Sequence, residues 1–172
     1  MQQRTRIKIC GLSQEADVAA AVEAGADAVG FVLYAKSSRH VSAARAGDLA
    51  RALPPFVTPV CLFVNAKPDD IHRALDLLPR AVLQFHGDET LAQCEAARRS
   101  YIRAARMSES LALVDFARAF AGASALLLDA DVQGYGGGGK VFDWSLIPTS
   151  VPLPLVLSGG LNPANVIDGV MR

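Results

Sequence analysis

Residues 6–33, RIKICGLSQEADVAAAVEAGADAVGFVL, decide the fold. The stretch begins with a short, mostly apolar run, Arg6–Cys10, continues through an amphipathic segment and ends with a second apolar run, Ala28–Leu33. Runs that are apolar at consecutive positions are typical of strands covered on both faces in a parallel sheet. Ser13, with an acid two residues later, predicts the start of a helix as its N-cap, and Gly25 predicts its end. The stretch therefore predicts a strand, a helix and a second parallel strand.

The same alternation continues along the chain. Further apolar runs predict strands at Pro59–Val64, Ala81–Phe85, Tyr101–Ala105, Ala125–Asp129 and Leu153–Ser158. Helix starts are predicted at Ser42, Pro68, Asp88-Glu89, Ser108-Glu109 and Asn162-Pro163. Strands that alternate with helices form a parallel sheet, either an open doubly wound sheet or a closed (β/α)8 barrel. Because no GxGxxG motif follows the first strand, the open dinucleotide-binding fold loses its main support.

Seven predicted strands are one too few for a closed barrel. A (β/α)8 TIM barrel has eight strands in about 250 residues, whereas this chain has 172. We therefore expect one domain, residues 1–172, with an α/β TIM-barrel fold whose eighth βα unit is absent from the sequence. We also expect the natural protein to continue by one such unit, about 30 residues long, because the first and last strands would otherwise be unpaired edges.

Composition narrows the classes of function. The 17 basic and 17 acidic residues give a formal net charge of zero, which argues against nucleic acid and anionic membranes as partners. The apolar runs are too short for a transmembrane helix, and MQQRTRIKIC lacks the apolar region of a secretory signal. Cys10, Cys61 and Cys94 are widely spaced, which argues against disulfides and structural zinc. We expect a cytoplasmic protein without a metal.

Polar or glycine residues stand at the carboxyl end of every predicted strand. They are Cys10, Tyr34 with the loop 36–39, Asn65, His86, Arg106, Asp129 and Ser158-Gly159-Gly160. In parallel barrels these ends converge on one mouth, which is where the chemistry takes place. Loops are polar in most proteins, so this pattern suggests a site without defining its reaction.

Two of these residues are candidates for proton transfer. Cys10 ends the first predicted strand, where a thiol near a cation can ionise and act as a base or nucleophile; the alternative is an inert core cysteine. Asp129 follows three leucines, where burial can keep a carboxyl group protonated for general acid catalysis; the alternative is a helix cap. Asp131 lies two residues further on, in the loop, and ranks second.

Two glycine-rich segments late in the chain predict a phosphate site. The loop GYGGGGK at 134–140 is either a flexible connector or a nest of backbone N–H groups open to an anion. The segment 158–160 offers the same chemistry at a helix start, and many barrels build a phosphate site from their last loops. The candidate substrate ligands in these segments are Gly136, Gly137, Gly139, Ser158, Gly159 and Gly160.

Arg39 and His86 complete the candidate site. Arg39 is the cation best placed to hold a carboxylate, or else a solvated loop residue. His86 lines the mouth, where we expect it to bind substrate, or caps the fourth helix. No histidine stands at metal-ligand spacing from a pair of acids, and we assign His72 to a helix face.

The motifs taken together resemble the phosphoribosylanthranilate isomerase family from Arg6 to about Met171. They are KICGL, GADAVGFV, KSSRHVS, LFVNA, LQFHGDE, LLLDA, GKVFDWSL and LSGGLNPANV. The resemblance implies a (β/α)8 barrel of tryptophan biosynthesis that performs an Amadori rearrangement of N-(5-phosphoribosyl)anthranilate without metal or organic cofactor. It implies Cys10 as general base, Asp129 as general acid, Arg39 at the anthranilate end of the substrate, and the late glycine loops at its phosphate.

Departures from the family pattern leave alternatives open. Ser38 and Gly138 stand where the family usually has proline and a hydroxyl residue, and the second change removes one expected phosphate hydrogen bond. Another phosphosugar barrel, an epimerase or indole-forming synthase, would need metal ligands or a catalytic lysine at a strand end. A non-catalytic or degenerate phosphosugar-binding barrel fragment is the second alternative. The expected partner is a small phosphosugar, bound by a monomer or homodimer.

Overall fold

The computed structural model describes residues 4–131 and 139–171. Its sheet has seven parallel strands in the order β1-β2-β3-β4-β5-β6-β7. They are β1 (Lys8–Cys10), β2 (Ala28–Val32), β3 (Thr58–Phe63), β4 (Val82–Phe85), β5 (Tyr101–Met107), β6 (Ala125–Ala130) and β7 (Leu155–Leu157). All seven predicted strands and their parallel α/β arrangement are confirmed.

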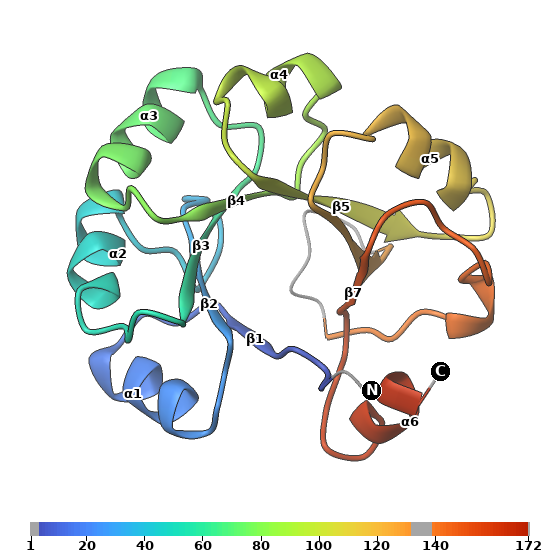
Figure 1. Ribbon diagram of the computed structural model, residues 1–172, viewed down its shortest axis with the longest axis horizontal. Helices are drawn as coiled ribbons and strands as arrows, with labels where there is room; N and C mark the ends of the chain where they lie inside the picture. Colours follow the sequence, from blue (N-terminus) through green and yellow to red (C-terminus); the bar gives the residue numbers. More distant parts are fainter. Residues whose placement is uncertain (1–3, 132–138, 172) are drawn as a thin grey trace.

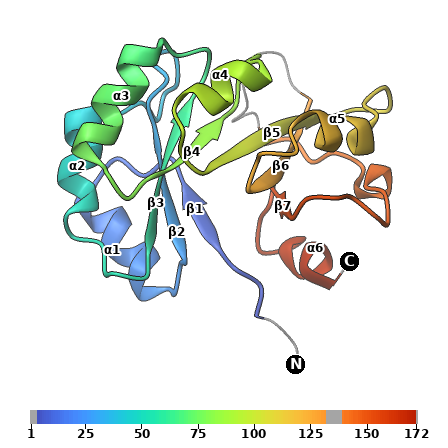
Figure 2. The same ribbon diagram turned by 45° about the horizontal axis from the view of Figure 1, so that its top comes forward.

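The helices lie outside the sheet, which curls into an arc with β1 and β7 at its two ends (Figure 1). They are α1 (Glu15–Glu23), α2 (Ala43–Ala50), α3 (Pro68–Leu77), α4 (Leu91–Ala96), α5 (Leu113–Ala119) and α6 (Val166–Met171), with a 3-10 turn at Trp144–Leu146. Figure 2 shows the first helices stacked beside β1–β4 and α6 near the far end of the arc. The described residues thus supply seven parallel strands, whereas a closed (β/α)8 barrel has eight.

Side chains alternate between the two faces of each strand, so the apolar residues form one cluster outside the sheet and another inside it. Phe31, Phe63 and Phe85 belong to the large cluster between the sheet and helices. Val32 and Leu62 belong to a smaller cluster, into which Cys10 packs. Because neighbouring side chains of a strand point to opposite faces, the residues adjacent to the outward phenylalanines point into the barrel. This parity places the polar residues of the strand ends on the inner face.

Several predicted helix starts are wrong. Ser13 is not the N-cap of α1, since Gln14 occupies that position and its side chain makes no cap hydrogen bond. The fourth helix starts not at Asp88-Glu89 but after Thr90, whose hydroxyl caps it in a capping box. Local sequence favours an acid at a helix start, but tertiary contacts described below engage Glu89 elsewhere.

The two remaining late starts are also misplaced: Ser108-Glu109 precede α5 by a turn, and Asn162-Pro163 form a turn before α6. By contrast, Ser42 caps α2 by accepting from the Arg45 N–H, and Pro68 lies in the first turn of α3. Gly25 follows α1 with φ of 85°, a left-handed conformation that ends helices.

The outer strands of the sheet leave apolar side chains exposed. In the described part of the chain β1 pairs only with β2, and β7 only with β6. Ile9 of β1 and Leu155 of β7 remain 40% and 38% exposed.

Within the described ranges, no helix is long and apolar enough to cross a membrane.

Candidate active site

Cys10 ends β1 with its thiol on the inner face of the sheet. Its pairing partner on β2 is Gly30, and a Cβ there would lie 2.7 Å from Cys10 Sγ. Only glycine therefore leaves room for the thiol at this point. Cys10 is partly exposed, whereas Cys61 and Cys94 are buried, and burial raises the pKa of those two thiols to about 12 and about 11. Cys10 is the accessible thiol of the three.

Arg39 reaches back from the loop after β2 to the end of β1. Its Nη1 donates to the carbonyl oxygen of Cys10 at 3.1 Å. The side chain lies against Gly11, where a Cβ would come within 2.5 Å of the same nitrogen. Gly11 also has φ of 88°, a conformation that L side chains rarely adopt. The structure thus brings the predicted cation to the main chain of the residue that carries the predicted thiol.

Asp129 lies within β6, at its carboxyl end, and is buried. Its Oδ2 is 3.0 Å from Nε2 of His86, and its Oδ1 accepts from the N–H of Ala130 at 3.0 Å. Gly159, with φ of 80°, packs so closely that a Cβ would lie 2.8 Å from Oδ1. Both carboxylate oxygens are therefore held in place. Asp131, the second-ranked acid, is exposed.

His86 follows β4 and links Asp129 to a residue that the sequence analysis missed. Its Nδ1 is 3.0 Å from Nε2 of Gln84, which is fully buried within β4. Gln84 and His86 are two residues apart and share the inner face. A signal was available, since an amide inside a buried strand, two positions before a histidine, predicts a polar contact. His86 does not cap α4, because Thr90 does.

A buried ion pair clamps the backbone around His86. Arg103 of β5 donates to the carbonyl oxygens of Phe85 and Gly87, both at 3.0 Å, and its Nη1 lies 3.4 Å from Oε2 of Glu89. Glu89 in turn accepts from the N–H groups of Asn65 and Gly87 at 2.7 and 2.8 Å. The loops after β3 and β4 are thus tied together.

Arg103 is buried on the outer face of the sheet. Its guanidinium lies 5.0 Å from the ring centroid of Phe120 and 5.8 Å from that of Phe116. Burial lowers the pKa of Arg103, and the Glu89 carboxylate opposes that effect. The sequence pattern does not indicate this pair, because Arg103 falls within a predicted strand and Glu89 within a predicted helix start.

The described end of the glycine-rich loop, Gly139-Lys140, meets Gly159 and Gly160 near Asp129. A Cβ on Gly160 would lie 2.7 Å from the carbonyl carbon of Lys140 and 2.8 Å from the carbonyl oxygen of Gly139. Gly159 and Gly160 both have positive φ, and their N–H groups donate to no residue of the described chain. The Ser158 hydroxyl donates to the carbonyl oxygen of Leu128 at 2.8 Å. The predicted ligands Gly136 and Gly137 lie outside the described residues.

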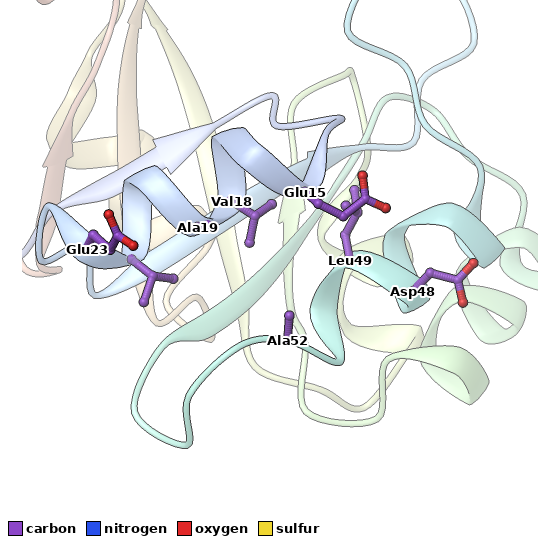
Figure 3. A pocket seen from close by; sticks show the side chains of 8 residues that line it. Glu15, Val18, Ala19, Glu23, Asp48, Leu49 and Ala52 are labelled. Carbon is purple, nitrogen blue, oxygen red and sulfur yellow. The ribbon is translucent and has the colours of Figure 1, made fainter.

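A groove between α1 and α2 lies in the helical layer (Figure 3). Its walls combine Val18 and Leu49 with the carboxylates of Glu15, Glu23 and Asp48. Glu15 is paired with Arg45, whose hydrogen bond lowers the pKa of that carboxyl group to about 2.

Within the described residues, no cluster of three or more His, Cys, Asp or Glu could hold a metal ion.

Comparisons with known proteins identify relatives of the whole described fold. An N-(5'-phosphoribosyl)anthranilate isomerase from Leptothrix cholodnii is 68% identical, over 98% of this chain and 77% of the relative. The enzyme of the same name from Methylibium petroleiphilum is 67% identical, over 98% of this chain and 79% of its own length.

Solved structures give the same result. The crystal structure of phosphoribosyl anthranilate isomerase from Thermotoga maritima matches with a TM-score of 0.86 and 41% identity, over 98% of this chain and 83% of that one. A crystal structure of phosphoribosyl anthranilate isomerase in complex with reduced 1-(o-carboxyphenylamino)-1-deoxyribulose 5-phosphate matches with a TM-score of 0.82 and 38% identity, over 98% of this chain and 82% of that one. The family model described as N-(5'phosphoribosyl)anthranilate (PRA) isomerase matches residues 7–171. The chain therefore belongs to the N-(5'-phosphoribosyl)anthranilate isomerase family.

Proposed function

We propose that this chain catalyses the isomerase reaction of its family in tryptophan biosynthesis. The reaction is the Amadori rearrangement of N-(5-phosphoribosyl)anthranilate to 1-(2-carboxyphenylamino)-1-deoxyribulose 5-phosphate. The observation that carries the proposal is the family match over residues 7–171, combined with an accessible thiol and a buried carboxyl group at strand ends of the same sheet.

The rearrangement needs one proton donor and one proton acceptor. The donor protonates the furanose ring oxygen, and the ring opens to an imine when its C–O bond breaks. The acceptor then removes the C2 proton to give an enamine, which tautomerises to the ketone. We assign the donor to Asp129 and the acceptor to Cys10. A positioned acid or base contributes on the order of 10²–10⁴-fold to rate.

The two ends of the substrate would be held by separate groups. Arg39, beside Cys10, is placed to pair with the anthranilate carboxylate, because guanidinium binds carboxylates in a bidentate manner. The N–H groups of Gly159 and Gly160, which donate to no residue of the described chain, suit a phosphate, with Gly139 packed against them. Ser158 supports this loop through its own hydrogen bond. Gly136 and Gly137 complete the proposed phosphate loop.

Substitution of the proton carriers tests the reaction. Cys10→Ser and Asp129→Asn should each lower kcat by on the order of 10²-fold or more, with an unchanged circular dichroism spectrum. Asp131→Asn, an exposed acid two residues from Asp129, is the matched control and should keep its turnover. Near-normal kcat in a folded Cys10 or Asp129 variant would refute that residue's role. No turnover in the unmodified chain would favour the non-catalytic phosphosugar-binding alternative.

Ligand binding tests Arg39. Arg39→Ala should weaken binding of the substrate or a carboxylate-bearing product analogue far more than binding of ribose 5-phosphate, measured by titration calorimetry. Equal losses for the two ligands would show that Arg39 serves the phosphate or the fold instead.

We also propose that the protein acts in the cytoplasm, as a monomer or homodimer. The free cysteines are compatible with a reducing compartment, and one solved structure is of monomers generated from the dimeric isomerase of Thermotoga maritima. Sedimentation velocity over a range of protein concentrations distinguishes the two assembly states.

A further inference from the structure

We propose that Gln84 and His86 are positioning residues for Asp129. In this proposal Gln84 fixes the tautomer of His86, and His86 then fixes the orientation of the Asp129 carboxyl group. The inference rests on the proposed function, in which Asp129 is the general acid, and it adds two residues to that function. Its evidence is a continuous chain of hydrogen bonds from Gln84 through His86 to Asp129.

The direction of each hydrogen bond follows from the atoms involved. The atom of Gln84 that faces His86 Nδ1 is the amide nitrogen, 3.0 Å away. An amide nitrogen can only donate, so Nδ1 accepts and carries no proton. In the neutral ring the proton is then on Nε2, which donates to Oδ2 of Asp129 at 3.0 Å. The contact with Gln84 thereby selects the tautomer that can donate a hydrogen bond to the Asp129 carboxyl group.

Burial keeps water out of this chain of contacts. The side chains of His86 and Asp129 are 8% and 12% exposed, and Gln84 is 1% exposed. Hydrogen bonds are electrostatically stronger in such surroundings than in water. Gln84 Oε1 makes no hydrogen bond within the described chain, so this glutamine is engaged by its nitrogen alone. A polar side chain held in the interior for one contact suggests a role beyond packing.

β5 lies between β4 and β6, and a small inward side chain on β5 lets the imidazole of His86 reach Asp129 on β6. Register pairs Ala104 of β5 with Leu127 of β6, and Arg106 with Asp129. Ala104 stands one position from Arg103, whose side chain lies on the outer face, so Ala104 points inward. Its methyl group is small enough for His86 to reach across β5 to Asp129.

The main chain that carries His86 is fixed independently of any ligand. Arg103 binds the carbonyl groups on both sides of it, those of Phe85 and Gly87, and Glu89 binds the Gly87 N–H. The His86 N–H donates to Phe63 O at 2.9 Å. A ring held this firmly can hold Asp129 before substrate arrives, which is how preorganised sites lower a barrier.

Loss of the contact should therefore affect turnover more than binding. Without His86, Oδ2 loses its donor and the carboxyl group can turn about its last torsion, while Ala130 still binds Oδ1. A small displacement of a reacting group costs on the order of 10²-fold in rate. We expect His86→Leu to lower kcat by about that factor, with KM changed by less than about threefold.

Conservative variants separate positioning from general structure. His86→Gln should recover much of the lost kcat, because its amide nitrogen extends about as far as Nε2 and can donate to Asp129. His86→Asn places its amide nearer to Nδ1 and should remain as slow as His86→Leu. Gln84→Leu should also lower kcat, because His86 could then carry its proton on either ring nitrogen. His72→Leu, at an exposed position of α3, is the control and should match the unmodified chain.

Nitrogen-15 NMR of the ligand-free protein tests the tautomer without any turnover. At neutral pH we expect His86 to be protonated at Nε2 and unprotonated at Nδ1, and Gln84→Glu to bring a proton to Nδ1. A proton on Nδ1 in the unmodified chain would refute the proposal, since the amide would then be reversed. Equal kcat for His86→Leu and the unmodified chain, or equal values for the Gln and Asn variants, would refute it too.

The two failures are distinguishable. If Asp129→Asn keeps its turnover, the proposed acid is wrong, whereas the NMR result still decides the tautomer. If His86→Leu does not fold, the NMR spectrum of the unmodified chain and the comparison of the Gln and Asn variants decide the proposal.

Discussion

Replacing Arg103 by methionine should destabilise the protein more than any other single loss of charge considered above. Arg103 makes three polar contacts, to Glu89 and to the carbonyl groups of Phe85 and Gly87. Methionine fills a similar volume against Phe120 but donates no hydrogen bond. Glu89 would remain buried among N–H donors without its counter-charge.

The expected cost follows from burial. The side chains of Arg103 and Glu89 are 6% and 4% exposed, so water cannot replace the lost partner. Breaking a buried ion pair by removing one partner costs about 3–5 kcal/mol, largely because a charge is left uncompensated. The two carbonyl groups that lose this donor act in the same direction, but such contributions do not add. We expect a loss of about 3–5 kcal/mol in the free energy of unfolding.

Urea denaturation followed by circular dichroism measures this loss. Arg118→Met is the matched control, because Arg118 forms an exposed pair with Asp115 on α5, with side chains 71% and 74% exposed. Such pairs contribute about 0–1 kcal/mol. A loss in Arg103→Met no larger than that of the control would refute the reasoning. In the double variant with Glu89→Gln, the loss should be smaller than the sum of the single losses.

Two further predictions concern titratable groups. In the native protein iodoacetamide should modify Cys10 and spare Cys61 and Cys94 until urea unfolds the chain, because burial raises the pKa of both protected thiols; mass spectrometry of quenched peptides reads the order, and early labelling of Cys61 would contradict it. The pKa of Glu15 is lowered from 4.5 to about 2 by its bond to Arg45, so its contribution to stability is complete above about pH 4.5 and is lost as the pH falls to about 2. A carboxyl NMR titration should show this low pKa, and it should return toward 4.5 in Arg45→Met; an unchanged low value in the variant would contradict the assignment.

The sequence predicted the fold well because strand signals in this chain are local. Each buried strand is a short apolar run between polar turns, and parallel strands covered on both faces need only that pattern. Helix starts were less predictable, since several residues can cap a helix and tertiary contacts choose among them. Thr90 and Glu89 illustrate this point: both suit a helix start, but Glu89 binds two backbone N–H groups of neighbouring loops.

The candidate site also contains residues that the sequence predicts and residues that it does not. Position at a strand end was sufficient to nominate Cys10, Arg39 and Asp129, and the structure adds the contact between the first two. Gln84 and Arg103 were not predicted, because each is a single polar residue inside an apolar strand, and Glu89, the partner of Arg103, comes from beyond the end of a neighbouring strand. A single sequence without an alignment offers no signal for such pairings beyond the presence of a polar residue in an apolar run.

The stretch LQFHGDE, residues 83–89, explains how one short segment serves both faces of the sheet. Its alternation sends Phe85 outward into the helical core and sends Gln84 and His86 inward. Glu89, beyond the strand, turns back to bind the main chain of the same segment at Gly87. Gln84 and His86 can therefore act at the mouth of the barrel only while the contacts of the outward residues hold their backbone in place. Substitutions of Arg103 should for this reason lower kcat through His86 at urea concentrations far below those that unfold the chain, although Arg103 itself lies on the opposite face.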